Sequence, residues 1–180
     1  MTPAEYIQLK AFARVDGALL AAIWVASFAF YIAGISDPLY GILALVLMLA
    51  TPFFVCRRLG KFRDEGRSGV ISMKRGWAYS AYVFFYAAVL LALAQYVYFA
   101  YIDQGYLLMT LTKMVSSPEA KTALEQYGLQ QVMDENLEMM GKMRPIDYAV
   151  NVLTVNIFIG VVLGLPIGAV MQRKVASHNS

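Results

Sequence analysis

Four long stretches without any Asp, Glu, Lys, Arg or His are the feature that most constrains how this chain can fold. They cover Ala18–Ile35, Leu39–Cys56, Trp77–Ile102 and Tyr148–Met171, and together make up nearly half of the 180 residues. A helix needs about 20 apolar residues to cross the ~30 Å hydrocarbon core of a bilayer. We therefore predict an all-α integral membrane protein that forms a single membrane domain, with one transmembrane helix in each stretch.

Other classes of structure fit these stretches poorly. Transmembrane strands alternate apolar and polar residues, whereas Leu43–Ala50 is uniformly apolar. The first stretch exceeds the ~7–15 residues of a signal-peptide core, so we expect it to be a retained helix. A composition of 59% hydrophobic and 15% charged residues argues against a soluble enzyme or a nucleic-acid module. A single Cys argues against a disulfide scaffold.

The basic residues predict which way the chain faces. With four spans, the leader, the segment 57–75 and the tail share one side, which holds 11 Lys and Arg (Lys174 of the tail among them) against four acids. The other side holds four Lys and Arg against eight acids. The positive-inside rule therefore predicts that both termini and the basic link 57–75 are cytoplasmic and that 103–147 is periplasmic.

The basic link also predicts a partner. Basic side chains next to an anionic leaflet are attracted to its headgroups, and the link has little of the aromatic interleaving typical of nucleic-acid binding. We predict contact with anionic lipid through seven side chains: Arg57, Arg58, Lys61, Arg63, Arg67, Lys74 and Arg75.

The segments outside the spans also carry helix signals. Thr2-Pro3-Ala4-Glu5 is a capping-box start, so a leader helix is expected to run into the first span. Ser36-Asp37-Pro38 leaves room only for a tight hairpin. In the outer segment we predict two short helices, over about 118–127 and 129–140, with Gly128 and Gly141 as stops. They are expected to lie on the membrane surface.

Three glycines, Gly160, Gly164 and Gly168, are spaced by four in the fourth span. That spacing places them on one helical face, where a second helix can approach closely. We predict a packing face, with the middle position Gly164 the most sensitive to a bulky side chain. The alternative is a hinge or gate, since Pro166 lies in the same stretch. The partner helix, from the same chain or a second copy, is left open.

Four polar side chains inside the spans are candidates for a functional role. Asn151 and Thr154 share one stripe of the fourth span, Asn156 projects from nearly the opposite side, and Gln95 lies in the third span. Polar groups within a bilayer tend to face the protein interior. They could line a substrate path, or they could bond between helices, with Gln95 as one partner.

The sequence contains no signature of catalysis. There is no nucleotide-binding loop, no paired Glu/His motif and no nucleophile signature. Thioethers bind copper(I), and six Met lie in the outer segment, but neither Cys nor His accompanies them: Met109, Met114, Met133, Met139, Met140 and Met143. We therefore predict no metal, no cofactor and no enzymatic activity.

Several short motifs resemble a bacterial membrane family. They are Arg63-Asp64, Gly69-Val70-Ile71-Ser72, Gly76, Tyr98-Phe99-Ala100-Tyr101-Ile102-Asp103, Pro145-Ile146, Ile159-Gly160 and Arg173-Lys174. The pattern is similar to the domain of unknown function 4199, found mostly in the Bacteroidetes lineage. The resemblance covers nearly the full length and implies the inner membrane of a Gram-negative bacterium. The family brings no established activity or catalytic residues.

Three functional hypotheses follow. The first is a non-catalytic accessory or scaffolding subunit of an envelope complex, because two sizeable extramembrane surfaces occur without a catalytic constellation. The alternative is a small homo-oligomeric transporter or channel, because the fourth span combines a polar stripe with Gly and Pro. A membrane-embedded enzyme ranks third. The expected partners are anionic lipids and either a second copy of the chain or a membrane protein.

Overall fold

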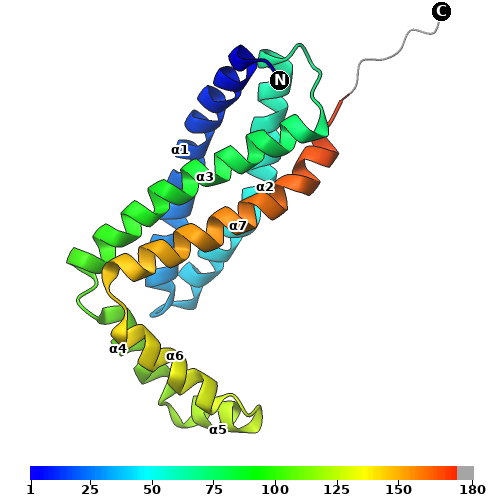
Figure 1. Cartoon of the computed structure of the whole chain (residues 1–180). Helices are drawn as coiled ribbons and strands as arrows, with labels where there is room; N and C mark the ends of the chain where they lie inside the picture. Colours follow the sequence, from blue (N-terminus) through cyan, green and yellow to red (C-terminus); the bar gives the residue numbers. More distant parts are fainter. Residues whose placement is uncertain (174–180) are drawn as a thin grey trace, which may run out of the picture.

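The computed structural model describes residues 1–173, which fold into a bundle of long helices and an arm of short ones (Figure 1). The bundle consists of α1 (Pro3–Gly34), α2 (Pro38–Gly66), α3 (Met73–Val97) with its π-helical extension η1 (Tyr98–Ile102), and α7 (Pro145–Met171). The arm consists of α4 (Tyr106–Val115), α5 (Pro118–Gln126) and α6 (Gln130–Lys142). Lys174, which the sequence analysis assigned to the basic side, lies outside the described residues.

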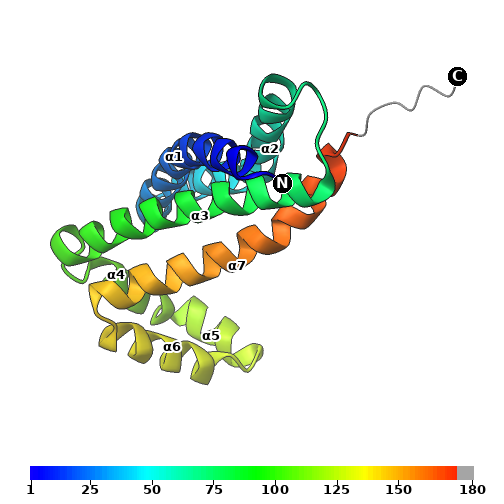
Figure 2. The ribbon, with the colours of Figure 1, turned by 45° about the horizontal axis from the view of Figure 1, so that its top comes forward.

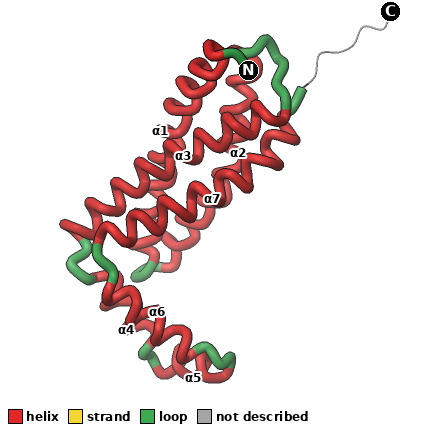
Figure 3. Tube along the Cα trace, viewed as in Figure 1, coloured by secondary structure: helices red, strands yellow, loops and turns green. Residues whose placement is uncertain are grey.

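The predicted all-α class is confirmed. Within residues 1–173 β-type pairing is limited to one isolated bridge, between Ile71 and Arg173, and four helices are long and apolar enough to cross a membrane. Figure 3 shows the loops only at the ends of the helices. At 32 residues, α1 is about 48 Å long, so it exceeds a ~30 Å hydrocarbon core.

Side chains at the starts of α1 and α2 cap these helices. The Thr2 hydroxyl accepts a hydrogen bond from the Glu5 amide, and the Glu5 carboxylate accepts one from the Thr2 amide, which completes the predicted capping box. Asp37 caps α2 by accepting from the Leu39 amide at 2.9 Å. Because α1 ends at Gly34 and α2 begins at Pro38, the predicted tight hairpin is confirmed.

The basic segment 57–75 differs from the expected link. Helix α2 continues to Gly66, so four of the seven basic residues lie on α2, Lys74 and Arg75 lie at the start of α3, and the loop itself covers only 67–72. The apolar stretch ends at Cys56, but Lys and Arg are good helix formers and 57–66 contains no Pro. Helix α2 therefore extends beyond the end of its apolar stretch.

The arm contains three helices instead of the predicted two. The missed helix α4 follows a turn in which Gln104 and Gly105 have positive φ angles of 45° and 83°. Asp103 stabilises this turn, since its carboxylate accepts from the amides of Gly105 at 3.0 Å and Leu107 at 3.1 Å. Gly128 ends α5 with a φ of 65°, as expected, but Gly141 lies inside α6.

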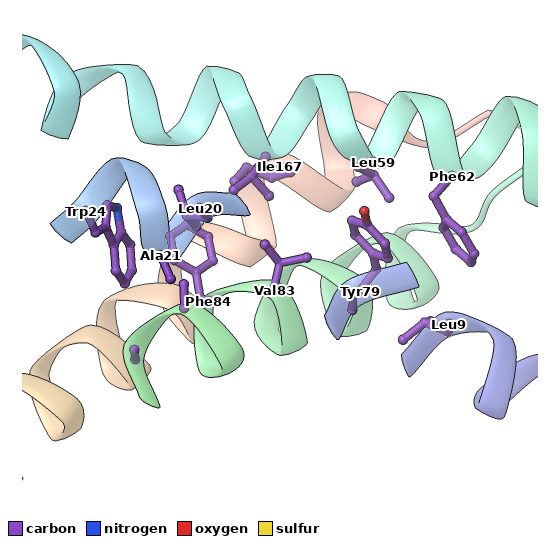
Figure 4. Close-up of a cluster of buried hydrophobic side chains, with 14 of the residues drawn as sticks. Leu9, Leu20, Ala21, Trp24, Leu59, Phe62, Tyr79, Val83, Phe84 and Ile167 are labelled. Atoms are coloured by element: carbon purple, nitrogen blue, oxygen red, sulfur yellow. The ribbon is translucent and has the colours of Figure 1, made fainter. Parts of the chain in front are cut away.

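Helix α3 is the centre of the bundle. It packs against α7 and α1, and α2 packs mainly on α1 and only sparsely on α7. Figure 2 shows α1 and α7 on opposite sides of α3. The buried core includes Leu20, Val83, Phe84 and Ile167, drawn in Figure 4. Phe62 of α2 stacks on Tyr79 of α3, with ring centroids 4.9 Å apart.

The two ends of the bundle differ. Figure 1 shows the N-terminus, the α2–α3 loop and the end of α7 together at one end, which we call the basic end. The arm leaves the other end, which we call the arm end. At the arm end the Ser36 and Tyr106 hydroxyls lie 2.9 Å apart, so the α1–α2 hairpin contacts the root of α4.

Candidate functional site: an apolar groove in the bundle

A cavity of about 800 Å³ lies among the bundle helices. Its walls come from α1, α2, α3 and α7, and Leu111 and Met114 of α4 contribute from the arm. The cavity exists because α7 packs closely on α3 while α2 packs on α1, which leaves the space between α2 and α7 poorly filled. We call it the groove.

The glycine face of α7 explains the close approach to α3. Gly160, Gly164 and Gly168 are all buried. A Cβ on Gly160 would overlap Phe84, and a Cβ on Gly168 would lie 2.7 Å from the Trp77 amide nitrogen. A Cβ on Gly164 would be 3.1 Å from the Trp77 ring. The partner helix therefore belongs to the same chain. The tightest approaches are at the two flanking glycines, which differs from the expectation that Gly164 is the critical one.

The hinge alternative rests on Pro166, which lies inside the fourth span. Helix α7 runs without interruption from Pro145 to Met171, through Pro166. Pro166 is exposed, whereas Ile167 and Gly168 beside it are buried. The proline thus lies on the outer side of α7, away from the contact with α3.

A few polar groups line the otherwise apolar groove. Trp24 donates through its indole N–H to the Thr51 hydroxyl at 2.9 Å, and Ser27 donates to the Ala44 carbonyl at 2.9 Å. These two pairs join α1 to α2. Their hydrogen-bonding groups are therefore largely used within the protein.

Two side-chain amides in the groove have fewer hydrogen-bond partners. Gln95 of α3 is 7% exposed and lines the groove, and its Oε1 is buried without a hydrogen-bond partner among the described residues. Asn156 of α7 also lines the groove, and its Nδ2 donates to the Val152 carbonyl of its own helix at 2.8 Å. Gln95 and Asn156 are two of the predicted intramembrane polar residues, and the structure places both in one cavity without a hydrogen bond between them.

The other predicted polar residues are placed differently. Asn151 and Thr154 are exposed on the outer surface of α7, so the expectation that they face the interior is wrong. Thr154 satisfies its hydroxyl on the Val150 carbonyl one turn earlier, at 2.9 Å. Because α3 contacts the glycine face of α7, the stripe of Asn151 and Thr154 turns away from the bundle.

A buried ion pair at the basic end was not recognised in the sequence. Asp16 of α1 is 2% exposed and accepts from Arg58 Nε of α2 at 2.5 Å. The Tyr79 hydroxyl of α3 donates to the other carboxylate oxygen. The available signal was an acid just before one apolar stretch and a base just after the next, which an antiparallel hairpin brings to the same level. This cluster joins three helices.

The basic side chains of 57–75 are mostly occupied inside the protein. Arg67 and Arg75 both pair with Glu5, at 2.8 and 2.9 Å, which ties the start of α1 to the α2–α3 connection. Arg63 pairs with Asp64 and also donates to the Met171 carbonyl at 3.4 Å. Lys61 lies 3.9 Å from Glu65. With Arg58 bound to Asp16, Arg57 and Lys74 remain exposed without an ion-pair partner among residues 1–173.

The motifs at the ends of α3 and α7 also find structural roles. Phe99 stacks on Tyr148 with ring centroids 4.3 Å apart, which joins η1 to α7. Ile71 exchanges two backbone hydrogen bonds with Arg173, at 3.1 and 2.9 Å.

No cluster of three or more His, Cys, Asp or Glu side chains suited to a metal ion occurs in the described part of the chain.

The bundle and its groove define an α-helical protein with four helices able to span a membrane. The chain belongs to the family described as "Protein of unknown function (DUF4199)", whose family model matches residues 16–173. This confirms the resemblance to the domain of unknown function 4199. Searches among curated proteins and among solved structures found no significant match.

Proposed function

We propose that this protein is a non-catalytic accessory protein of a bacterial inner membrane, and that its bundle holds a molecule taken from the bilayer. The groove is the observation that supports this proposal. Its volume of about 800 Å³ lies within the roughly 300–1,000 Å³ of small-molecule sites. A mainly apolar lining with a few polar groups is also typical of such sites.

The position of the groove suggests how a molecule would enter. Leu45 and Met48 of α2 line the groove, yet they are 55% and 63% exposed. Side chains that line a cavity and also contact the surroundings form its mouth. On a transmembrane helix these surroundings are lipid, so an apolar molecule would enter sideways from the bilayer.

The chemistry of the lining supports binding without catalysis. General acid–base catalysis needs a titratable side chain near the reacting group. The residues that line the groove include no Asp, Glu, Lys, Arg, His or Cys, and their one titratable side chain, Tyr31, is 50% exposed. The acid at the basic end, Asp16, is bound by Arg58 and Tyr79 and lies outside this lining.

A homo-oligomeric transporter or channel is the second candidate, and the exposed polar stripe on α7 favours it. A polar side chain directed toward lipid is costly and tends to be covered by protein. A second copy of the chain that covered Asn151 and Thr154 would satisfy this requirement. A partner protein in an envelope complex would do the same, which fits the accessory role.

The orientation proposed for this function has both termini in the cytoplasm and the arm in the periplasm. The charge asymmetry between the basic end and the arm supports it. The arm has only one buried residue, Leu107, among its three helices. Short helices without a core are marginal in water, so we propose that the arm rests on the membrane or on a partner.

The test of the proposed function uses the full chain purified in mild detergent. Native mass spectrometry should detect about one retained small molecule per chain. Ala44→Phe should fill the groove, because Ala44 is buried in its wall, and retention should fall at least about tenfold. Ala50→Phe, on the exposed side of the same helix, is the matched control and should retain the molecule.

Two outcomes would contradict the proposal. Equal retention by Ala44→Phe and Ala50→Phe would show that the molecule binds elsewhere. Absence of any retained molecule, even after reconstitution into native lipid, would show that the groove holds none. A symmetric oligomer that conducts solute and loses this conduction with Asn151→Leu would favour the transporter candidate instead.

A further inference from the structure

We infer that the groove selects an electrically neutral amphiphile, whose polar group both donates and accepts a hydrogen bond at Gln95. This inference rests on the proposed function and names the class of molecule. An alcohol or an amide with one long apolar chain has the required chemistry. A fatty acid anion or a pure hydrocarbon does not.

The unpaired amide of Gln95 is the first observation. Gln95 lies on α3, is more than nine-tenths buried, and has an Oε1 without a partner in the described part of the chain. A buried polar atom without a hydrogen bond destabilises the protein, so native proteins satisfy nearly all such atoms. Because the residue lines the groove, a rotation of its terminal amide brings the buried oxygen to the groove, where a bound molecule is the available partner.

The amide also restricts the ligand's polar group. A glutamine side chain has one carbonyl acceptor and an NH₂ that donates twice. Its terminal torsion is soft, so the two ends of the amide can exchange places facing the groove. A hydroxyl or an amide satisfies either arrangement, because each of these groups donates and accepts.

Asn156 of α7, which also lines the groove, provides a second point of recognition. Its Nδ2 is used on the Val152 carbonyl, which leaves the Asn156 carbonyl oxygen as an acceptor. That oxygen accepts no hydrogen bond from residues 1–173 in this structure. An acceptor at this wall favours a ligand with a donor and repels a carboxylate or phosphate oxygen.

The absence of cations from the lining decides between neutral and anionic ligands. No Lys, Arg or His is among the residues that line the groove. An unpaired anion in an apolar environment is strongly disfavoured, and a buried charge needs a partner. Most of the basic residues lie at the basic end of the bundle, and the four of the arm and its junction with α7, Lys113, Lys121, Lys142 and Arg144, are not among the residues that line the groove. An anionic headgroup in the groove would therefore be unpaired.

A hydrocarbon is disfavoured because it has no group that can form a hydrogen bond. It would fill the apolar part, but it would leave the Gln95 amide buried without a partner. The ligand therefore needs an apolar chain for the aliphatic and aromatic walls and one neutral polar group for the amides.

Trp24 provides a direct probe of binding. It lines the groove, and Trp24 and Trp77 are the two tryptophans of the chain. In a Trp77→Phe background, quenching of Trp24 fluorescence by brominated probes reports occupancy. The probes are 12-bromododecan-1-ol, 12-bromododecanoate and 1-bromododecane, all titrated into the full chain in one detergent.

The comparison between variants removes differences in how the probes partition into micelles. The measured quantity is the preference for the alcohol, defined as its affinity divided by that of bromododecane. This preference should be about tenfold higher in the Trp77→Phe protein than in the same protein with Gln95→Leu. Gln95→Met, which keeps an unbranched side chain, should lose the preference in the same way. Asn156→Leu should weaken it in the same sense. Asn151→Leu, on the exposed face of α7, is the control and should leave it unchanged.

The outcomes separate this inference from the proposed function. If all three probes quench Trp24, compete with one another and are blocked by Ala44→Phe, but Gln95→Leu and Gln95→Met keep the preference, the groove binds ligands and the inference about their class is wrong. The inference also fails if the carboxylate binds as tightly as the alcohol. If no probe reaches Trp24, both the inference and the proposed function fail.

Discussion

Gly168 on α7 lies against Gly76 on α3, with its Cα only 3.1 Å from where a Cβ on Gly76 would be. The two helices therefore meet near the basic end with no side chain between them. In lipid, where apolar burial gives little drive to association, such backbone proximity holds helices together.

The first prediction concerns the order of sensitivity along this contact. Gly160→Ala and Gly168→Ala should each lower thermal stability in detergent clearly, by the equivalent of about 1–3 kcal/mol, as overpacking does. Gly164→Ala should have a smaller effect, because the closest atom to its new Cβ would be on the Trp77 ring, at 3.1 Å, and the closest backbone atom would be 3.4 Å away.

Gly141→Ala is the matched control. This glycine is also helical, and a Cβ there would lie at an ordinary 3.5 Å from Leu108. Gly105 would be a poor control because its φ of 83° disfavours any side chain. If Gly164→Ala proves the most damaging of the set, the close contacts at the flanking positions are not the ones that hold α7.

The second prediction concerns the buried pair of Asp16 and Arg58. Asp16→Asn should destabilise the bundle by about 3 kcal/mol, because removal of one partner leaves a charge without its counterion. The side chains of Asp16 and Arg58 are 2% and 24% exposed. Asp64→Asn is the control, since the Asp64 side chain is 54% exposed and surface pairs contribute little.

A double-mutant cycle makes this test stronger. Asp16→Leu with Arg58→Met should be more stable than either single variant, because both charges are then removed together. Reversible unfolding in mixed micelles would provide the free energies. Additive effects of the two substitutions would show that the pair does not act as a unit.

The third prediction concerns anionic lipid at the basic end. Arg57→Gln with Lys74→Gln should weaken the preference for anionic over neutral lipid more than Arg67→Gln with Arg75→Gln. The reason is that Arg67 and Arg75 are engaged with Glu5, whereas Arg57 and Lys74 are exposed and each exposed base near the leaflet attracts its headgroups.

Spin-labelled phosphatidylglycerol in reconstituted vesicles would measure this preference. The selectivity should also decrease with salt. Equal losses in the two double variants would indicate that all the basic residues act on lipid together, as the sequence alone suggested.

The fourth prediction is the orientation. On a Cys56→Ser background, a single Cys at position 120 of the arm should react with an impermeant maleimide in intact cells. A Cys at Ser68, in the loop at the basic end, should react only after lysis. Position 120 lies on α5 of the arm and Ser68 lies in the α2–α3 loop, and Figure 1 shows α5 and this loop at opposite ends of the molecule. The reverse pattern would overturn the orientation taken from the basic residues.

The long-range contacts show where sequence reasoning stopped. The spacing of Gly160, Gly164 and Gly168 indicated a packing face, but a periodic pattern carries no information on which helix fills it. Asn151 and Thr154 were expected inside the bundle because polarity normally indicates an inward face. The glycine face contacts α3 instead, and a helix that turns one face inward must turn its opposite face outward.

Local chemistry was readable because its partners are near in the sequence. The uncharged stretches determined the helical class and the four candidate spans, since a bilayer admits few other backbones. The Thr2 and Glu5 capping box and the Asp37 turn depend on residues three positions apart or fewer. The tertiary structure decided the rest: Asp16 meets Arg58, Arg67 and Arg75 meet Glu5, and Gln95 is left unpaired in a groove. These relations depend on how rigid helices pack, and packing is a property of whole faces in contact, which no single segment specifies.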